Sequence, residues 1–142
     1  MRIRFSPLLA VGTQTMVPTL VLFSVYLLVV GHDVPGGGFA GGLIASSALL
    51  LVFLAFGGGG VRRALPIDPE TTMGVGLILA LLAGSIGLVF GNSFLTYTYA
   101  QWTVPVVGDI KVSTLLLFDV GVYFVVIGLV ATAILKLGSD RR

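Results

Sequence analysis

Four apolar runs dominate the chain, and each is long enough to cross a lipid bilayer. They cover residues 12–30, 39–56, 72–90 and 113–137, and none carries Lys or Arg before its last residues. A helical span needs about 20 mostly apolar residues, and a backbone in hydrocarbon must satisfy its own hydrogen bonds. Because 56% of the residues are hydrophobic and only 10% are charged, the sequence predicts an all-α integral membrane protein. It has four transmembrane helices in a single domain, residues 1–142.

The basic residues predict how these helices are oriented. Four spans place both termini and the connection between the second and third spans on one side. That side holds every Lys and Arg of the chain except Lys111. Lys and Arg accumulate in cytoplasmic segments, so the N and C termini are expected to be cytoplasmic. Arg2 and Arg4 imitate a secretory signal, but three more apolar runs follow, and the first span is expected to be retained.

Two connections are interpreted as loops on opposite sides of the membrane. The cytoplasmic one, residues 57–71, is rich in Gly and Pro and ends in a helix-start pattern made by Asp68, Pro69 and Glu70. The outer one, residues 92–112, carries four aromatic residues. Tyr and Trp favour the headgroup layer of a bilayer. The outer connection is therefore expected to lie along the membrane surface.

Small residues recur at close helical spacing in three of the spans. Lipid gives no hydrophobic drive for helix association, so membrane helices pair where small residues let their backbones approach closely. These positions predict helix–helix contacts, and their number indicates that some contacts are made with other proteins. They are Gly38, Gly42 and Ser46 in the second span, Gly84, Gly87 and Gly91 in the third, and Gly121 and Gly128 in the fourth.

The stretch from Gly31 to Gly42, GHDVPGGGFAGG, holds the only His of the chain and joins the first two spans. Pro favours a turn, and glycines adopt backbone conformations closed to other residues. A second helix that starts directly afterwards presents unpaired amides at the outer surface, where a carboxylate or anion is favoured. The hinge is assigned to Gly31, Pro35, Gly36, Gly37, Gly38, Phe39, Gly41 and Gly42.

Asp119 is the only acidic residue inside an apolar span. A charge near mid-bilayer costs about 3 kcal/mol, so such residues face protein or water and often mark ion paths. His32, Asp33 and Asp119 are expected on the same outer side, with Tyr123 one helical turn from Asp119 and able to bond to it. One interpretation is an outer-facing ion access site, with His32 able to titrate near neutral pH. The other is a structural pin that holds Asp119 against the glycine-rich turn.

Other kinds of site are not expected. The chain has no Cys and no set of His, Asp and Glu that resembles a metal site. No nucleophile and base stand at a useful spacing, so catalytic residues, a metal and a cofactor are not predicted. The hydroxyls of Thr13, Thr15 and Thr19 in the first span are expected to bond to their own helix. Nucleic acid is not an expected partner, because the basic residues flank membrane spans.

Two stretches carry a resemblance to a known family. GHDVPGGGFAGG with the following LIASSALLL, and LLFDVGVYFVVIG around Asp119, resemble the MnhB (MrpB) family of B-type subunits from prokaryotic multisubunit Na+/H+ antiporters. The resemblance covers essentially the whole chain. It implies a transporter subunit of the prokaryotic plasma membrane, with A-, C-, D-, E-, F- and G-type subunits and lipid as partners and Na+ and H+ as transported ions. It also implies that the proton machinery lies mainly in the large A- and D-type subunits, and that the B-type subunit is required for assembly.

Two other functions remain open from the residues alone. One is a purely structural scaffold subunit of an ion-translocating complex related to complex I or to hydrogenases. The other is a small dimeric exporter of the four-helix multidrug type. That class depends on an acidic residue in its first span, and none is present here.

Overall fold

The four predicted spans are all helical in the structure. The computed structural model describes residues 6–30, 37–89, 99–104 and 108–139. Each helix is long and apolar enough to cross a membrane, which confirms the predicted fold class. The helices are α1 (Pro7–Val30), α2 (Gly37–Ala64), α3 (Pro69–Val89) and α4 (Thr114–Ser139).

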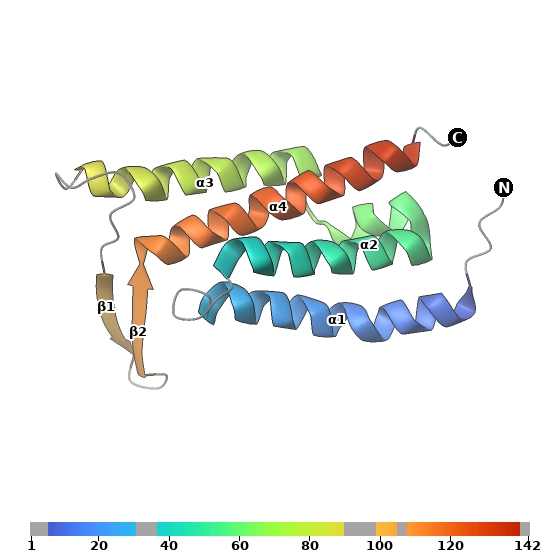
Figure 1. The fold of residues 1–142 in the computed structure, drawn as a ribbon, viewed down its shortest axis with the longest axis horizontal. Helices are drawn as coiled ribbons and strands as arrows, with labels where there is room; N and C mark the ends of the chain where they lie inside the picture. The colour runs from blue at the N-terminus through green and yellow to red at the C-terminus, as the bar shows by residue number, and fades with distance from the viewer. Residues whose placement is uncertain (1–5, 31–36, 90–98, 105–107, 140–142) are drawn as a thin grey trace.

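The helices lie side by side in the order α1, α2, α4, α3 (Figure 1). α4 packs against both α2 and α3, whereas α1 packs almost entirely against α2. α1 begins and α4 ends at the same end of the bundle, as an even number of crossings requires (Figure 1). The fold does not fix which side of the membrane this end faces, so the cytoplasmic placement of the termini stays a prediction.

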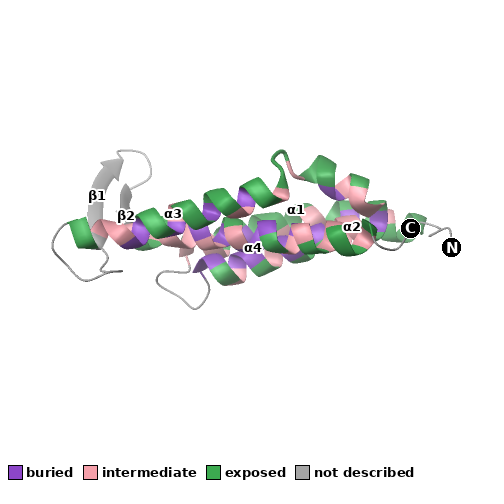
Figure 2. Cartoon of the chain, turned by 90° about the horizontal axis from the view of Figure 1, so that it is seen from above, coloured by how far each residue is buried: buried purple, intermediate pink, exposed green. Residues whose placement is uncertain are grey.

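The outward faces of the two edge helices are strongly apolar. Leu8 and Leu22 on α1 are 82% and 73% exposed, and Leu81 and Leu82 on α3 are more than half exposed. Figure 2 shows that the buried positions gather where the helices face one another. A surface of this kind would aggregate in water. It is suited to lipid and to other membrane helices.

Glycines bring α3 and α4 into backbone contact, as their spacing predicts. A Cβ built on Gly121 would lie 2.6 Å from the amide nitrogen of Ala80 and 2.7 Å from the carbonyl oxygen of Gly76. A Cβ on Gly128 would lie 2.7 Å from the carbonyl oxygen of Pro69. These two glycines are therefore used for contacts within the chain. Gly76 on α3 is the counterpart of Gly121, and its role was not predicted.

α2 extends further than the predicted second span. Residues 57–71 were interpreted as a loop, but the helix continues to Ala64 across a break at Gly57, where φ is 70° and ψ is −170°. Only glycine adopts this backbone conformation readily. The segment after the break, residues 58–65, turns back against the bundle (Figure 1), and we call it the returning segment. The loop interpretation was therefore wrong for this half of the connection.

Core packing explains why the returning segment is ordered. Val61 has no exposed surface, and it belongs to a buried cluster with Ala45, Leu49 and residues of α4. Leu65 packs against the same cluster. The four consecutive glycines suggested a flexible loop because they lack side chains. The apolar residues that follow them nevertheless find a partner surface that is not visible in the sequence.

The start of α3 agrees with its sequence pattern. α3 begins at Pro69, and the amide of Thr72 donates to the carbonyl oxygen of Asp68 at 2.9 Å. Pro at the first helical position loses no hydrogen bond, since that amide would have no helical partner. Glu70 forms an ion pair with Lys136 of α4 at 2.9 Å, but both side chains are more than half exposed. An exposed pair of this kind contributes about 0–1 kcal/mol to stability.

A β-hairpin lies in the connection between α3 and α4. β1 (Tyr99–Val104) pairs antiparallel with β2 (Gly108–Ser113), with Trp102 opposite Ile110. The sequence analysis described this segment only as a surface connection and missed the hairpin. Its alternation of aromatic or β-branched residues with polar ones was the available signal. β2 ends at Ser113 and α4 begins at the next residue. The hairpin therefore lies at the end of the bundle where α4 begins (Figure 1).

Candidate functional site

The first turn of α2 lies directly against α4 at Asp119. A Cβ built on Gly38 would overlap the carbonyl oxygen of Asp119, so only glycine permits this contact. Gly37 has a positive φ of 81°, and a Cβ there would lie 3.4 Å from Oδ2 of Asp119. The Asp119 side chain, which is half-buried, is thus placed beside the start of a helix. The free amides of a helix start favour a negative charge.

Gly41, the next described glycine of the motif, leaves space for a side chain of α4 to reach α1. Tyr123 lies one turn after Asp119, and its ring passes close to Gly41, where a Cβ would lie 3.4 Å from Cδ2 of the ring. Its hydroxyl reaches Ser24 of α1, with 2.9 Å between Oη and Oγ. Ser24 is fully buried and Tyr123 is 8% exposed. A larger residue at position 41 would also meet the Ser24 carbonyl oxygen, since a Cβ there would lie 2.8 Å from it.

The direction of this hydrogen bond follows from the second bond of Ser24. The Ser24 hydroxyl donates to the carbonyl oxygen of Val21 at 2.7 Å. A serine hydroxyl has one proton to donate, so the Tyr123 hydroxyl is the donor in the bond to Ser24. The structure therefore gives Tyr123 a different partner from the Asp119 carboxylate that the sequence suggested. Ser24 was missed, because a serine inside an apolar helix gives no sign of which face it occupies.

The glycines of the motif have different roles in the structure. Gly38 and Gly42 face α4, and a Cβ on Gly42 would lie 2.8 Å from Cβ of Val126. Gly41 faces α1. Phe39 is 60% exposed and points away from this junction. The described part of the motif is therefore a meeting point of three helices, with Asp119 at its edge.

Five of the predicted residues lie outside the described residues, so the structure does not test their roles. They are Gly31, His32, Asp33, Pro35 and Gly36. An approach of His32 or Asp33 to Asp119 stays a prediction. Among the described residues, no group of three or more His, Cys, Asp or Glu is placed to hold a metal ion.

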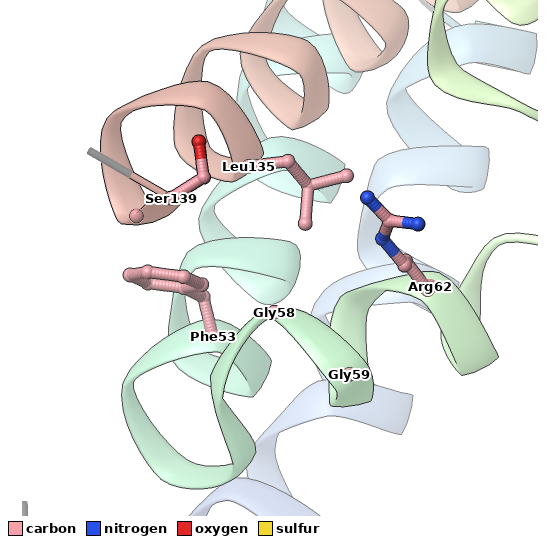
Figure 3. Close-up of a pocket in the computed structure, with 7 residues that line it drawn as sticks. Phe53, Gly58, Gly59, Arg62, Leu135 and Ser139 are labelled. Carbon is pink, nitrogen blue, oxygen red and sulfur yellow. The ribbon is translucent and has the colours of Figure 1, made fainter. Parts of the chain in front are cut away.

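A second concave region lies at the other end of the bundle, between the returning segment and the end of α4. Figure 3 shows Phe53 and Leu135 beside this cavity, and Arg62 is its one cationic lining residue among those that the structure describes. Its volume is about 460 Å³. A neighbouring cavity of about 270 Å³ is also lined by Arg62, together with charged residues at the start of α3 and the end of α4. From the sequence, these charges were predicted to be only loop and helix-end residues.

Comparison with known proteins identifies the family of this chain. A family model described as a domain related to the MnhB subunit of Na+/H+ antiporter matches residues 8–132. The B-type subunit of the Na(+)/H(+) antiporter of Bacillus subtilis is 41% identical over 134 residues, which is 94% of each chain. Its counterpart of the same name from Alkalihalophilus pseudofirmus is 42% identical over 130 residues, or 90% of each chain. The chain belongs to the MnhB family.

A solved structure extends this similarity to the fold. A chain in the structure of the Mrp complex from Dietzia sp. DQ12-45-1b superposes with a TM-score of 0.78 and 34% identity. The match covers 96% of this chain but only 15% of the solved chain. The MnhB fold therefore also occurs as a small part of a much longer polypeptide. The predicted family is confirmed, and this MnhB chain is a multi-pass membrane protein.

The Tyr123–Ser24 bond in this MnhB chain leads to a stability prediction. Tyr123→Phe removes the donor and is expected to cost about 1 kcal/mol, the usual net value of a neutral hydrogen bond. Ser24→Ala is expected to cost more, since it leaves the buried tyrosine hydroxyl without its acceptor. Thermal unfolding of both single variants and the double variant measures the coupling. A double variant whose cost equals the sum of the two single costs would show that the hydroxyls are not coupled.

Proposed function

We propose that this chain is the B-type subunit of an Mrp-type multisubunit Na+/H+ antiporter, in which the α2–α4 crossing lines an ion access path. Two kinds of observation support the assembly. Relatives more than 40% identical over nine-tenths of the chain are named as the B-type subunits of such antiporters. In addition, two edge helices expose apolar faces that four helices alone do not cover. The remaining Mrp subunits are therefore the proposed partners, and Na+ and H+ the proposed transported ions.

The observation that carries the ion-path proposal is the position of Asp119. Its carboxylate is half-buried beside Gly37, at the start of α2 and five residues into α4. At about 1.5 Å per residue this is roughly 7 Å from the start of α4. A carboxylate at that depth lowers the cost of bringing a cation or proton in from the nearer surface. The free amides at the start of α2 favour a negative charge on Asp119 when no transported ion is beside it.

Asp119→Asn in the assembled complex tests this proposal. The substitution keeps the shape of the side chain and removes its charge. Na+-dependent proton exchange in everted vesicles is expected to fall about tenfold, which corresponds to about 1.4 kcal/mol in the barrier. Native gels must show the same amount of assembled complex as the unmodified protein. Undiminished exchange in an intact complex would exclude an ion path through Asp119.

A structural role for the same residue is the second candidate. It is favoured by the tight contact between Gly38 and the Asp119 backbone, which makes the residue part of the packing between α2 and α4. On this alternative, Asp119→Asn lowers the amount of assembled complex, and each complex that remains exchanges ions at the normal rate. Normalising exchange to assembled complex therefore separates the two roles. Membership of the MnhB family argues against the small dimeric exporter.

A further inference from the structure

α1 and α3 lie at opposite edges of the bundle (Figure 1). The exposed residues of their outer faces differ in polarity. Successive residues of a helix are turned by about 100°, so Thr15 lies opposite the buried Ser24, while Gln14 lies about 80° from Ser24 at the border of the outer face. We call residues 14, 15, 18 and 19 the polar stripe. Its members Gln14, Thr15, Pro18 and Thr19 are all exposed.

The hydroxyls of the polar stripe are satisfied by the helix itself, as the sequence predicts. Thr15 donates to the carbonyl oxygen of Val11 at 3.1 Å, and Thr19 donates to that of Thr15 at 3.5 Å. Thr13 does not follow this expectation. Its hydroxyl is buried inside the bundle, and within the described part of the chain it has no hydrogen-bond partner. Thr13 belongs to the inner face and is not part of the stripe.

Gln14 is different from the two threonines. Its amide offers two donors and an acceptor, and it makes no hydrogen bond within the residues that the structure describes. Pro18 has no N–H, so it cannot supply the usual bond to the Gln14 carbonyl. Within the described residues, the side-chain amide of Gln14 is therefore available to bond to a group from another molecule.

The depth of Gln14 argues against lipid tails as its neighbour. α1 has 24 residues and is about 36 Å long, against about 30 Å of hydrocarbon. With α1 centred in the bilayer, Gln14 lies roughly 8 Å inside the hydrocarbon. A polar group left unpaired there costs several kcal/mol. The outer face of α3 is apolar by contrast, with Val75, Ile78 and Leu81 exposed, and it suits lipid as it is.

We propose that the polar stripe of α1 docks a transmembrane helix of another antiporter subunit, which presents an amide or hydroxyl side chain to Gln14. This inference rests on the proposed function, because it requires that other subunits are present. The stripe thus fits a hydrogen-bonding helix and not an acyl chain.

Gln14→Leu tests the docking proposal, because a docked helix and a lipid-facing surface predict different changes in the yield of assembled complex. Removing an interhelical hydrogen bond is worth about a three- to thirtyfold loss of association, so the yield of assembled complex is expected to fall at least about threefold. On a lipid-facing surface the same substitution leaves the yield unchanged or raises it, and that result would overturn the proposal. Met16→Leu is the matched control on the same helix, because Met16 is 54% exposed and carries no polar group.

Cross-linking identifies the occupant directly. The chain has no Cys, so Thr15→Cys and Leu81→Cys each provide a single attachment point for a photoreactive maleimide in the native complex. The expected product at position 15 is an adduct with another antiporter subunit, in clearly higher yield than at position 81. Adducts with lipid alone, with a second copy of this chain, or in equal yield at both positions would overturn the proposal. An unmodified chain that purifies with no other subunit would instead refute the proposed function.

Discussion

Replacing Gly38 by alanine is expected to disrupt the packing of α2 on α4 more than any other single methyl group added to the described residues. The added Cβ overlaps the carbonyl oxygen of Asp119. A backbone atom cannot rotate away as a side chain can, so the two helices must separate. Overpacking typically costs about 1–3 kcal/mol, and the upper end is expected here. For a chain of this size that lowers the melting temperature by about 10 °C.

The same substitution links stability to transport. Moving the Asp119 backbone also moves its carboxylate away from the start of α2. Gly38→Ala is therefore expected to lower both the thermal midpoint of the purified complex and its rate of ion exchange. Gly74→Ala is the control, since a Cβ at Gly74 would meet nothing within 4 Å. A Gly38→Ala complex with an unchanged melting temperature would show that the α2–α4 contact is not as close as the structure has it.

Gly121→Ala is expected to have the second-largest effect, at the crossing of α3 and α4. The new Cβ would lie 2.6 Å from the backbone nitrogen of Ala80 and 2.7 Å from the carbonyl oxygen of Gly76. Both are backbone atoms, so we again expect a cost of about 2–3 kcal/mol. Within the described residues of this chain, α3 packs extensively against α4 alone. Its displacement is expected to appear as protease sensitivity and a lower thermal midpoint.

A double variant distinguishes helix separation from local strain. Gly76 faces Gly121, and a Cβ on Gly76 would lie 2.6 Å from the Gly121 carbonyl oxygen. Once one alanine has forced the helices apart, the second costs less, so Gly76→Ala with Gly121→Ala is expected to be less destabilising than the sum. Gly74→Ala is the control on α3, because a Cβ there meets nothing within 4 Å. Strict additivity of the two costs would argue against a shared crossing.

The candidate site was predictable in most of its parts and in one of its connections. Asp119 stands out because it is a lone acid in an apolar span, and the glycine motif because of its density. A contact between them was one of the two interpretations open from the sequence, and the crossing of α2 and α4 produces it. Tyr123 was found by its spacing from Asp119, but its partner proved to be Ser24, 99 residues away in the chain. No local pattern identifies such a partner.

The sequence by itself determined that this is a membrane protein with four helices, because the length and apolarity of each run leave hydrocarbon as the only suitable solvent and the helix as the only self-sufficient backbone. It also determined the family, through the residues around Asp119 and the glycine motif. Only the tertiary structure decided the direction of the returning segment after Gly57 and the use of Gly121 and Gly128 within the chain. The physical reason is that lipid and neighbouring helices are equally apolar. Hydrophobicity therefore selects the spans, and the close fit of one backbone against another selects which spans meet.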